Sequence, residues 1–252
     1  MQVTLLAYTP DPETTVACAA KLCYAAADIG TVRQGLTPEK TASFLDMLRD
    51  IGHESPIEHA SFTFGVEGVS RSLLAQLTRH RLASYSVQSQ RYVKESCFEF
   101  VTPPEIEALP QAKEEFLRAM EEDAKHYERL AALLQEKHYQ ALLAQGEGPA
   151  SAKRKAEKRA IEDARFVLPN ACATKLLCTM TARSLLNFFT HRCCNRAQWE
   201  IRALAMEMLR QAKGAAPHLF GTAGPPCLRG ACPEGKMSCG QAAQVRESFS
   251  KL

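Results

Sequence analysis

Residues 79–92 constrain this chain more than any other stretch, because few of their side chains can enter a hydrophobic core. The stretch holds three arginines, a histidine, two glutamines, three serines and two tyrosines around only three aliphatic side chains. Buried donors need partners and unpaired buried charges are costly, so these residues must face solvent or a ligand. Arginine beside hydroxyl and amide groups suits a phosphate or carboxylate. A helix end followed by a polar turn fits equally well, and the residues alone leave both interpretations open.

Length and composition are those of an ordinary globular protein. The 252 residues, of which 46% are hydrophobic and 23% charged, can form a substantial core. A net charge of +3 is too small for bulk nucleic-acid binding. No leader pattern and no apolar run of roughly 20 residues is present, so we expect a cytoplasmic protein without a membrane partner. The ten cysteines are then expected to be reduced.

Periodicity predicts a helix-rich α+β fold with a small, mainly antiparallel sheet formed by strands early in the chain. Strands are expected over 2–8 and 62–66. Helices are expected over 11–26, 37–52, 70–80, 105–143 with an interruption at Pro110, 172–191 and 196–213. We predict a single catalytic domain over 1–220 and a Gly/Pro/Cys-rich tail over 221–252.

A second polar cluster, residues 52–59, precedes a predicted strand. Its histidines, His53 and His59, are six positions apart with Pro56 between them, which excludes the spacing of four used by helical zinc proteases. The cluster is either a ligand site or a turn whose histidines pair with Glu54 or Glu58.

A third cluster combines Arg165 with residues 181–192. On a helix, Arg183 and Asn187 share one face. Asn187 also lies among four apolar neighbours, where an amide is costly without a defined partner. A solvated helix stripe is the simpler alternative.

The tail and a basic run suggest a different class of protein. Cys227, Cys232 and Cys239 are spaced by five and seven, unlike a zinc ribbon, and a fourth ligand would have to be His218, Cys193 or Cys194. We expect unconnected thiols there, and small core residues at Cys172 and Cys178. Lysines and arginines over 153–159 are interleaved with acids, which favours a solvated helix face. A nucleic-acid-binding protein with a basic helix and a zinc-binding tail is the alternative function. No dinucleotide fingerprint, phosphate-binding loop or nucleophile elbow is present.

Together the polar clusters resemble one family, the flavin-dependent thymidylate synthases, also called thymidylate synthase complementing proteins. Its signature is Arg-His-Arg, two residues, Ser, four residues, Ser, one residue, Arg. Here it is met by Arg79-His80-Arg81, Ser84, Ser89 and Arg91. Segments 52–59, 182–188 and 197–200 also look like family segments in the same order. The resemblance runs from about residue 15 to 215 and omits the tail.

This resemblance implies the flavin-dependent thymidylate synthase fold and a methyltransferase of dTMP biosynthesis. The enzyme would convert dUMP to dTMP with methylenetetrahydrofolate as one-carbon donor and NADPH-reduced FAD as hydride source. The residues implied for dUMP are Gln76, Arg79, Val87, Gln88, Ser89, Gln90, Arg91, Arg165 and Arg192. Those implied for FAD are His53, Ser55, Arg79, His80, Arg81, Val87, Thr181, Arg183 and Asn187. No metal is implied, and no nucleic acid.

The resemblance also implies roles and an assembly. Arg192 would be catalytic, lying beside the uracil, and His53 would pack on the flavin ring. Homotetramers would form, with each active site built from several subunits. Val87 stands where many members have Glu or Gln, and Thr181 where some have Asn, so side-chain contacts at both positions would be lost or weakened. Ser89 has no adjacent general base, so we expect it to bind phosphate or ribose.

Overall fold

The computed structural model describes residues 1–91 and 98–252, which form two compact units. Unit 1 comprises residues 1–66, 75–86 and 176–252, and unit 2 comprises residues 67–74 and 87–175. The single catalytic domain over 1–220 stays a prediction. Tyr92, the last residue of the polar stretch, lies outside the described residues. Among the helices described, none combines the length and the apolar character needed to cross a membrane.

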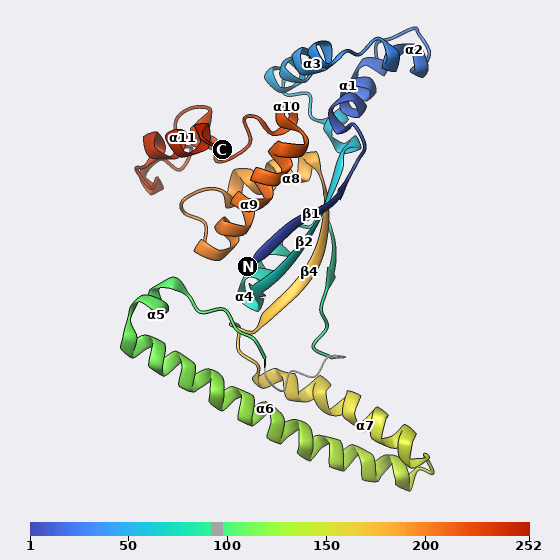
Figure 1. The fold of residues 1–252 in the computed structure, drawn as a ribbon, viewed down its shortest axis with the longest axis vertical. Helices are drawn as coiled ribbons and strands as arrows, with labels where there is room; N and C mark the ends of the chain where they lie inside the picture. The colour runs from blue at the N-terminus through green and yellow to red at the C-terminus, as the bar shows by residue number, and fades with distance from the viewer. Residues whose placement is uncertain (92–97) are drawn as a thin grey trace. The chain divides into compact units, whose positions relative to one another are not determined.

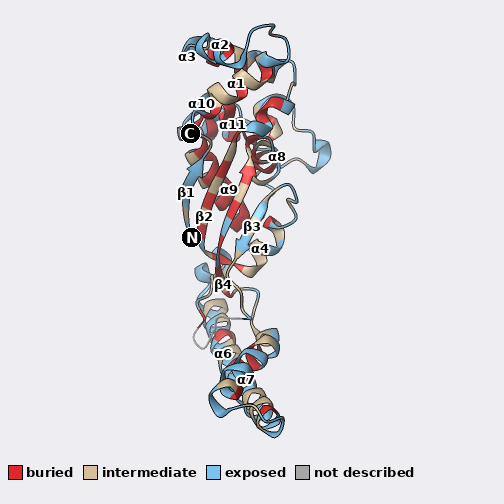
Figure 2. Ribbon diagram, turned by 90° about the vertical axis from the view of Figure 1, so that its right-hand side faces the viewer, coloured by how far each residue is buried: buried red, intermediate tan, exposed pale blue. Residues whose placement is uncertain are grey.

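A four-stranded antiparallel sheet accompanies the helices, which confirms the predicted α+β class (Figure 1). Its order is β1-β2-β4-β3, with strands β1 (Gln2–Tyr8), β2 (Ser61–Ser70), β3 (Ser84–Val87) and β4 (Ala173–Thr181). Both predicted strands are confirmed. Phe62, Phe64 and Val66 are fully buried, and the residues between them are only partly buried (Figure 2). This period of two is the one read from the sequence.

The predicted helix over 172–191 is wrong in its first half. That half is strand β4, and only α8 (Ala182–Arg192) is helical. Burial alternates along β4 from Thr174 to Met180, so one side of the strand faces the core. The Thr181 hydroxyl then accepts a hydrogen bond from the backbone of Ser184 at 3.2 Å and caps α8. Because β4 lies late in the chain, the expectation that strands occur only early in the chain is also wrong.

Helix α3 shows how sequence signals place a helix. Thr37 caps its start by accepting a bond from the backbone N–H of Lys40 at 3.3 Å. Gly52, at a φ of 71°, follows its end, as predicted. By contrast, α1 ends at Leu22, short of the predicted residue 26.

The helices of unit 1 are α1 (Pro12–Leu22), α2 (Ile29–Gln34), α3 (Pro38–Asp50), α8, α9 (Trp199–Ala215), α10 (Pro217–Phe220) and α11 (Ala242–Ser250), with 3-10 helices η1 (Ser55–His59), η3 (Pro226–Leu228) and η4 (Gly235–Met237).

An aromatic cluster joins the sheet of unit 1 to its C-terminal helices. The ring of Phe220 meets Phe62 edge-on at 5.2 Å between centroids and Phe189 at 5.9 Å. All three side chains are fully buried. Helix α9 packs against β1 and α8 (Figure 1). The core therefore holds α8, which carries several predicted site residues, against the sheet.

Unit 2 is mainly a helical hairpin formed by α6 (Pro110–Ala144) and α7 (Pro149–Ala164). The interruption predicted at Pro110, after α5 (Pro104–Ala108), is confirmed. Small buried residues such as Ala152 and Ala156 let the two helices approach closely. The basic residues of 153–159 are exposed, which confirms a solvated face. The 3-10 helix η2 (Arg165–Val167) follows α7, and α4 (Arg71–Leu77), shorter than predicted, follows β2.

Candidate functional site

Unit 1 contains a pocket of about 1120 Å³ with many cationic side chains, here called the arginine pocket. Six of the nine residues predicted for FAD line it: Arg79, His80, Arg81, Thr181, Arg183 and Asn187. The first three lie in the loop after α4, and the others lie at the end of β4 and in the first half of α8. Two segments far apart in the sequence therefore meet in this pocket.

The three arginines predicted for FAD in this pocket differ in their partners. Arg183 pairs with Glu58 at 2.5 Å and with Glu54 at 3.3 Å, and the Glu58 carboxylate raises the pKa of this guanidinium. Arg79 and Arg81 are exposed, and within the described chain neither has a side-chain hydrogen bond or ion pair. These two cations are therefore available to an anion.

The 52–59 cluster lies partly at the arginine pocket. Glu54 and Glu58 line it, whereas His53 and Ser55 do not. The His53 ring nitrogen Nε2 lies 3.2 Å from the Ser55 hydroxyl. The alternative in which histidines pair with the two carboxylates is wrong for residues 52–59, because both carboxylates bind Arg183.

Asn187 does not need the buried partner that its apolar neighbours suggested. Its side chain is exposed on the same face of α8 as Arg183, while Phe188 and Phe189 turn into the core. The amide is therefore free to face a ligand. Thr181, by contrast, uses its hydroxyl to cap α8 and to donate to the Ser184 hydroxyl at 3.2 Å.

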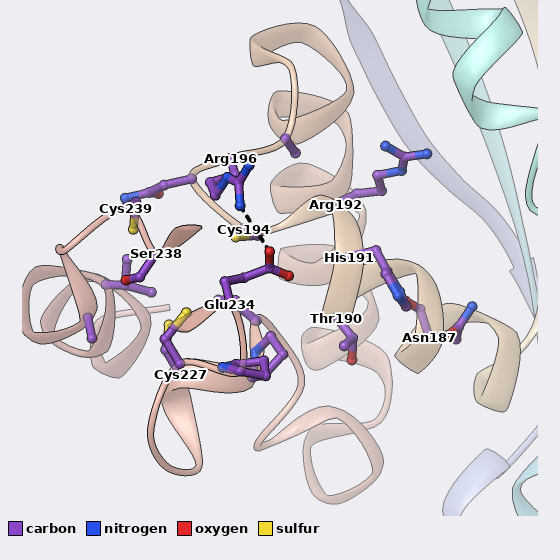
Figure 3. Close-up of a pocket in the computed structure, with 18 of the residues that line it drawn as sticks. Asn187, Thr190, His191, Arg192, Cys194, Arg196, Cys227, Glu234, Ser238 and Cys239 are labelled. Carbon is purple, nitrogen blue, oxygen red and sulfur yellow. Dashed lines mark hydrogen bonds and ion pairs between the residues drawn. The ribbon is translucent and has the colours of Figure 1, made fainter. Parts of the chain in front are cut away.

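Arg192, the predicted catalytic residue, is bonded to a histidine of the arginine pocket. Its Nε atom donates to Nε2 of His80 at 3.1 Å. Burial, with the positive charge of Arg192 and of His191 nearby, lowers the pKa of His80 from 6.5 to about 4. His80 is therefore neutral at physiological pH and accepts the bond. Both residues also line a second pocket, of about 570 Å³, next to the C-terminal segment (Figure 3).

Tyr85 positions the loop after α4, and the sequence analysis missed this role. Its hydroxyl donates to the backbone carbonyl oxygens of His80 at 2.9 Å and of Leu77 at 3.0 Å. Burial raises the pKa of this phenol further above its usual value, so it stays protonated. A tyrosine between arginines and serines was the available signal, because a buried phenol needs a partner.

In unit 2, one glutamate holds two of the residues predicted for dUMP. The carboxylate of Glu162 pairs with Nε of Arg91 at 2.7 Å, and its backbone carbonyl accepts from Nε of Arg165 at 3.1 Å. Glu162 was also missed from the sequence. Because it lies three residues before Arg165 on a charged helix, its acidic side chain looked like one more solvated charge.

Backbone contacts of unit 2 fix the rest of the signature segment. The backbone N–H of Gln88 donates to the backbone carbonyl oxygen of Lys175 at 3.0 Å. The backbone carbonyl oxygen of Gln88 accepts a hydrogen bond from the guanidinium of Arg71 at 2.9 Å. The amide of Gln90 lies 3.5 Å from the sulfur of Cys172. The Ser89 hydroxyl accepts from the backbone of Arg91 at 3.2 Å. The predicted dUMP residues are thus divided: Gln76, Arg79 and Arg192 belong to unit 1, and Val87, Gln88, Ser89, Gln90, Arg91 and Arg165 belong to unit 2.

The buried cysteines have the character of core residues. Cys172 and Cys178 are both buried, as predicted. Burial raises the pKa of Cys178 and of Cys193 to about 12. Such thiols stay protonated and are poor nucleophiles.

A helix-rich α+β fold with uncompensated arginines around a large pocket defines a protein that binds phosphate-bearing ligands. The model of one family, described as thymidylate synthase complementing protein, matches residues 4–218. The chain belongs to this family.

Proteins named flavin-dependent thymidylate synthase are similar over nearly the whole chain. The one from Clostridium tetani is 53% identical, with 99% of this chain and 97% of the relative covered. The one from Geobacter sulfurreducens is 49% identical, covering 100% and 99%. That of Nitratidesulfovibrio vulgaris is 44% identical, covering 95% and 94%. The nucleic-acid-binding alternative gains no support from these relatives, and Lys155, one of the basic residues of α7, is paired with Glu147.

Proposed function

We propose that this chain is a flavin-dependent thymidylate synthase. It methylates dUMP to dTMP with methylenetetrahydrofolate as one-carbon donor, and it takes the reducing hydride from NADPH through FAD. The observation that carries the proposal is the arginine pocket, where Arg79 and Arg81 have no anionic partner among the described residues and the neutral His80 is bonded to Arg192. Family membership and the names of the relatives give the reaction.

The residues of the arginine pocket fit FAD. The cofactor carries a pyrophosphate, and Arg79, Arg81 and Arg183 would hold its two negative charges. Arg183 is less free than the others, because it must share its charge with Glu54 and Glu58. Asn187 would add an amide from the same face of α8. Once reduced by NADPH, bound FAD would supply the hydride that completes the methyl group.

Arg192 would act on the pyrimidine. A guanidinium beside the N3/O4 edge of uracil stabilises negative charge there, and this makes C5 more nucleophilic. The bond from its Nε to His80 leaves the two terminal nitrogens to the substrate. His80 would thus orient the catalytic arginine while remaining uncharged.

The phosphate of dUMP would be held by Arg91 and Arg165. Both guanidinium groups have their Nε atoms bonded to Glu162, which holds the two arginines in defined orientations. Ser89 would add a hydroxyl. Gln76, Gln88, Gln90 and the backbone of Val87 would complete the set, with Arg79 shared between substrate and cofactor.

We further propose a homotetramer in the cytoplasm, in which each site takes residues from several copies. Two exposed apolar side chains flank the arginine segments and support an interface there. Leu82 follows Arg81 and Phe166 follows Arg165, and both are 82% exposed. A neighbouring copy of the chain that covered these side chains would remove apolar surface from water, which would stabilise the assembly.

The visible spectrum of the purified protein tests flavin binding, and tritium release from dUMP labelled at C5 tests the reaction. We expect a yellow protein and release that requires FAD, NADPH and methylenetetrahydrofolate. Colourless protein that stays colourless with added FAD would contradict the cofactor, and tritium release without added folate would contradict the methyl transfer.

A further inference from the structure

The C-terminal segment of unit 1, residues 221–252, supplies part of the wall of the arginine pocket. Thr222, Ala223 and Arg229 line this pocket together with the arginines predicted for FAD. The family match ends at residue 218, and every residue predicted for FAD or dUMP lies before residue 193. The segment therefore adds a guanidinium to the pocket at a position that the family signature does not include.

We propose that Arg229 binds a phosphate group of FAD and so extends the cofactor site into the C-terminal segment. This inference rests on the proposed function, since it takes FAD as the ligand of the arginine pocket. Arginine suits the role because its planar guanidinium can bind two phosphate oxygens at once. The pyrophosphate carries two negative charges, and Arg229 would share them with Arg79, Arg81 and Arg183.

The guanidinium of Arg229 is available to an anion. Its side chain is exposed, and among the described residues it has neither a side-chain hydrogen bond nor an ion pair. Arg49, which also lines the pocket, is instead paired with Asp46 at 2.8 Å. Arg229 therefore resembles Arg79 and Arg81, the two arginines of the pocket that also lack an anionic partner within the described chain.

The backbone on both sides of Arg229 is held by one arginine of α11. Arg246 donates to the carbonyl oxygen of Cys227 at 2.8 Å and to that of Gly230 at 2.7 Å. Arg229 lies between these two residues, and its own N–H donates to the carbonyl oxygen of Pro226 at 3.1 Å. Because the backbone is already fixed, a ligand that binds the side chain has only the side chain to order.

Apolar packing anchors the same turn to the last helix of the chain. Helix α11 packs against η3, and Phe249 of α11 and Cys227 of η3 are both buried. Gly224 has a φ of 141°, and a Cβ added there would approach Leu228 and Phe249 to 2.6 Å. The chain therefore passes very close to these side chains, and a packed cluster sets the position of Arg229.

The turn borders both pockets of unit 1. Ala223 and Arg229, on either side of the turn, line the arginine pocket. Cys227 and the two prolines before it line the second pocket, where Figure 3 shows Cys227. A ligand in the arginine pocket would therefore meet the C-terminal segment at Arg229 and not at its cysteines.

Titration of full-length, flavin-free protein with FAD, followed by flavin fluorescence, tests the role of Arg229. Arg229→Ala should raise the Kd for FAD by about tenfold, because a charge-assisted hydrogen bond to phosphate is lost. Riboflavin has no phosphate, so it should bind the wild type and Arg229→Ala equally. Added salt should weaken FAD binding less in the variant than in the wild type, since salt screens exposed charge pairs.

Lys236→Ala is the matched control, because it removes one positive charge from the same segment at an exposed position outside both pockets. Its Kd for FAD should stay near the wild-type value. Arg229→Gln keeps a polar side chain and removes the charge, so it decides the question if Arg229→Ala unfolds.

Three results would overturn the inference and leave the proposed function intact. The first is a wild-type Kd for FAD in the Arg229 variants. The second is an equal rise in Kd for Arg229→Ala and Lys236→Ala, which would assign the effect to net charge. The third is an equal loss of riboflavin and FAD binding, which would assign Arg229 a structural role. Wild-type protein that binds no FAD would overturn the proposed function and this inference together.

Discussion

The Nε atom of Arg192 donates a hydrogen bond to Nε2 of His80 across 3.1 Å, and this bond links the end of α8 to the loop after α4. The His80 ring also packs edge-on against Phe188, with 4.9 Å between centroids. Burial of this imidazole and, to a lesser extent, the positive charge of the neighbouring guanidinium lower the pKa of His80, so the ring stays neutral at physiological pH. The arginine is therefore fixed by a neutral acceptor and keeps its own charge for a ligand.

Arg192→Ala should reduce kcat by about 10²–10³-fold while flavin content stays near the wild-type value, because a preorganised donor to developing negative charge is lost. Tritium release and the visible spectrum measure the two quantities. Arg210→Ala is the matched control, since Arg210 is exposed and pairs with Glu207 on α9. Colourless Arg192→Ala protein would assign this residue to cofactor binding instead.

The stability of the protein should fall as the pH drops from 6.5 towards 4, partly through His80. In that window the unfolded histidine binds a proton that the folded one rejects, because the folded pKa is about 4 against 6.5. Protonation therefore favours the unfolded chain, and above pH 6.5 this effect disappears. Thermal unfolding at several pH values should show a steeper acid loss for the wild type than for His80→Asn. Parallel curves would show that His80 does not titrate in this way.

Arg81→Ala should weaken FAD binding more than Arg183→Ala does. Arg81 has no counter-charge among the described residues, so its full interaction with the pyrophosphate is lost, about tenfold to a hundredfold in Kd. Arg183 must first loosen its pairs with Glu54 and Glu58, which reduces its net contribution. Fluorescence titration of the apoprotein with FAD measures both constants. The reverse order would mean that the two carboxylates release Arg183 in the complex.

Glu162→Gln should raise the KM for dUMP by at most about fivefold and leave kcat nearly unchanged. The Arg91–Glu162 pair is about half exposed, and such pairs contribute roughly 0.2–1 kcal/mol. Its role is to orient Arg91, so steady-state kinetics at varied dUMP is the measurement. Asp163→Asn, which changes the exposed neighbour, is the control. An equal rise in KM for both variants would point to general electrostatics.

Phe62→Ala should lower the free energy of unfolding by about 3–5 kcal/mol, because it leaves a cavity in the aromatic cluster. Phe62 is fully buried and contacts both Tyr8 and Phe220. Denaturant unfolding monitored by circular dichroism gives the value. Tyr24→Ala, at a side chain 83% exposed, should change stability by less than about 0.5 kcal/mol. Similar losses in both variants would show that this cluster is not the core of unit 1.

Local signals predicted those elements whose pattern is set by neighbours in the sequence. Thr37 and Gly52 bound α3 because a side-chain cap and a left-handed glycine act within one turn. The alternating phenylalanines of β2 were equally clear. Residues 173–181 were wrongly predicted as helix. Over so few residues, the spacing of apolar side chains does not distinguish a strand from a helix, and a true helix follows directly.

Residue types at short spacing were enough to predict the α+β class, the positions of the arginine clusters and the family. Three further features became visible only in the folded chain: Glu162 orients Arg91, Tyr85 holds the loop at His80, and Cys194 lines the same pocket as the three tail cysteines. Each of these contacts joins residues that packing brings together from separate elements or from non-adjacent positions of a loop. The spacing of residues along the chain does not predict the distances between such side chains, because these distances depend on how helices and strands bury their apolar faces.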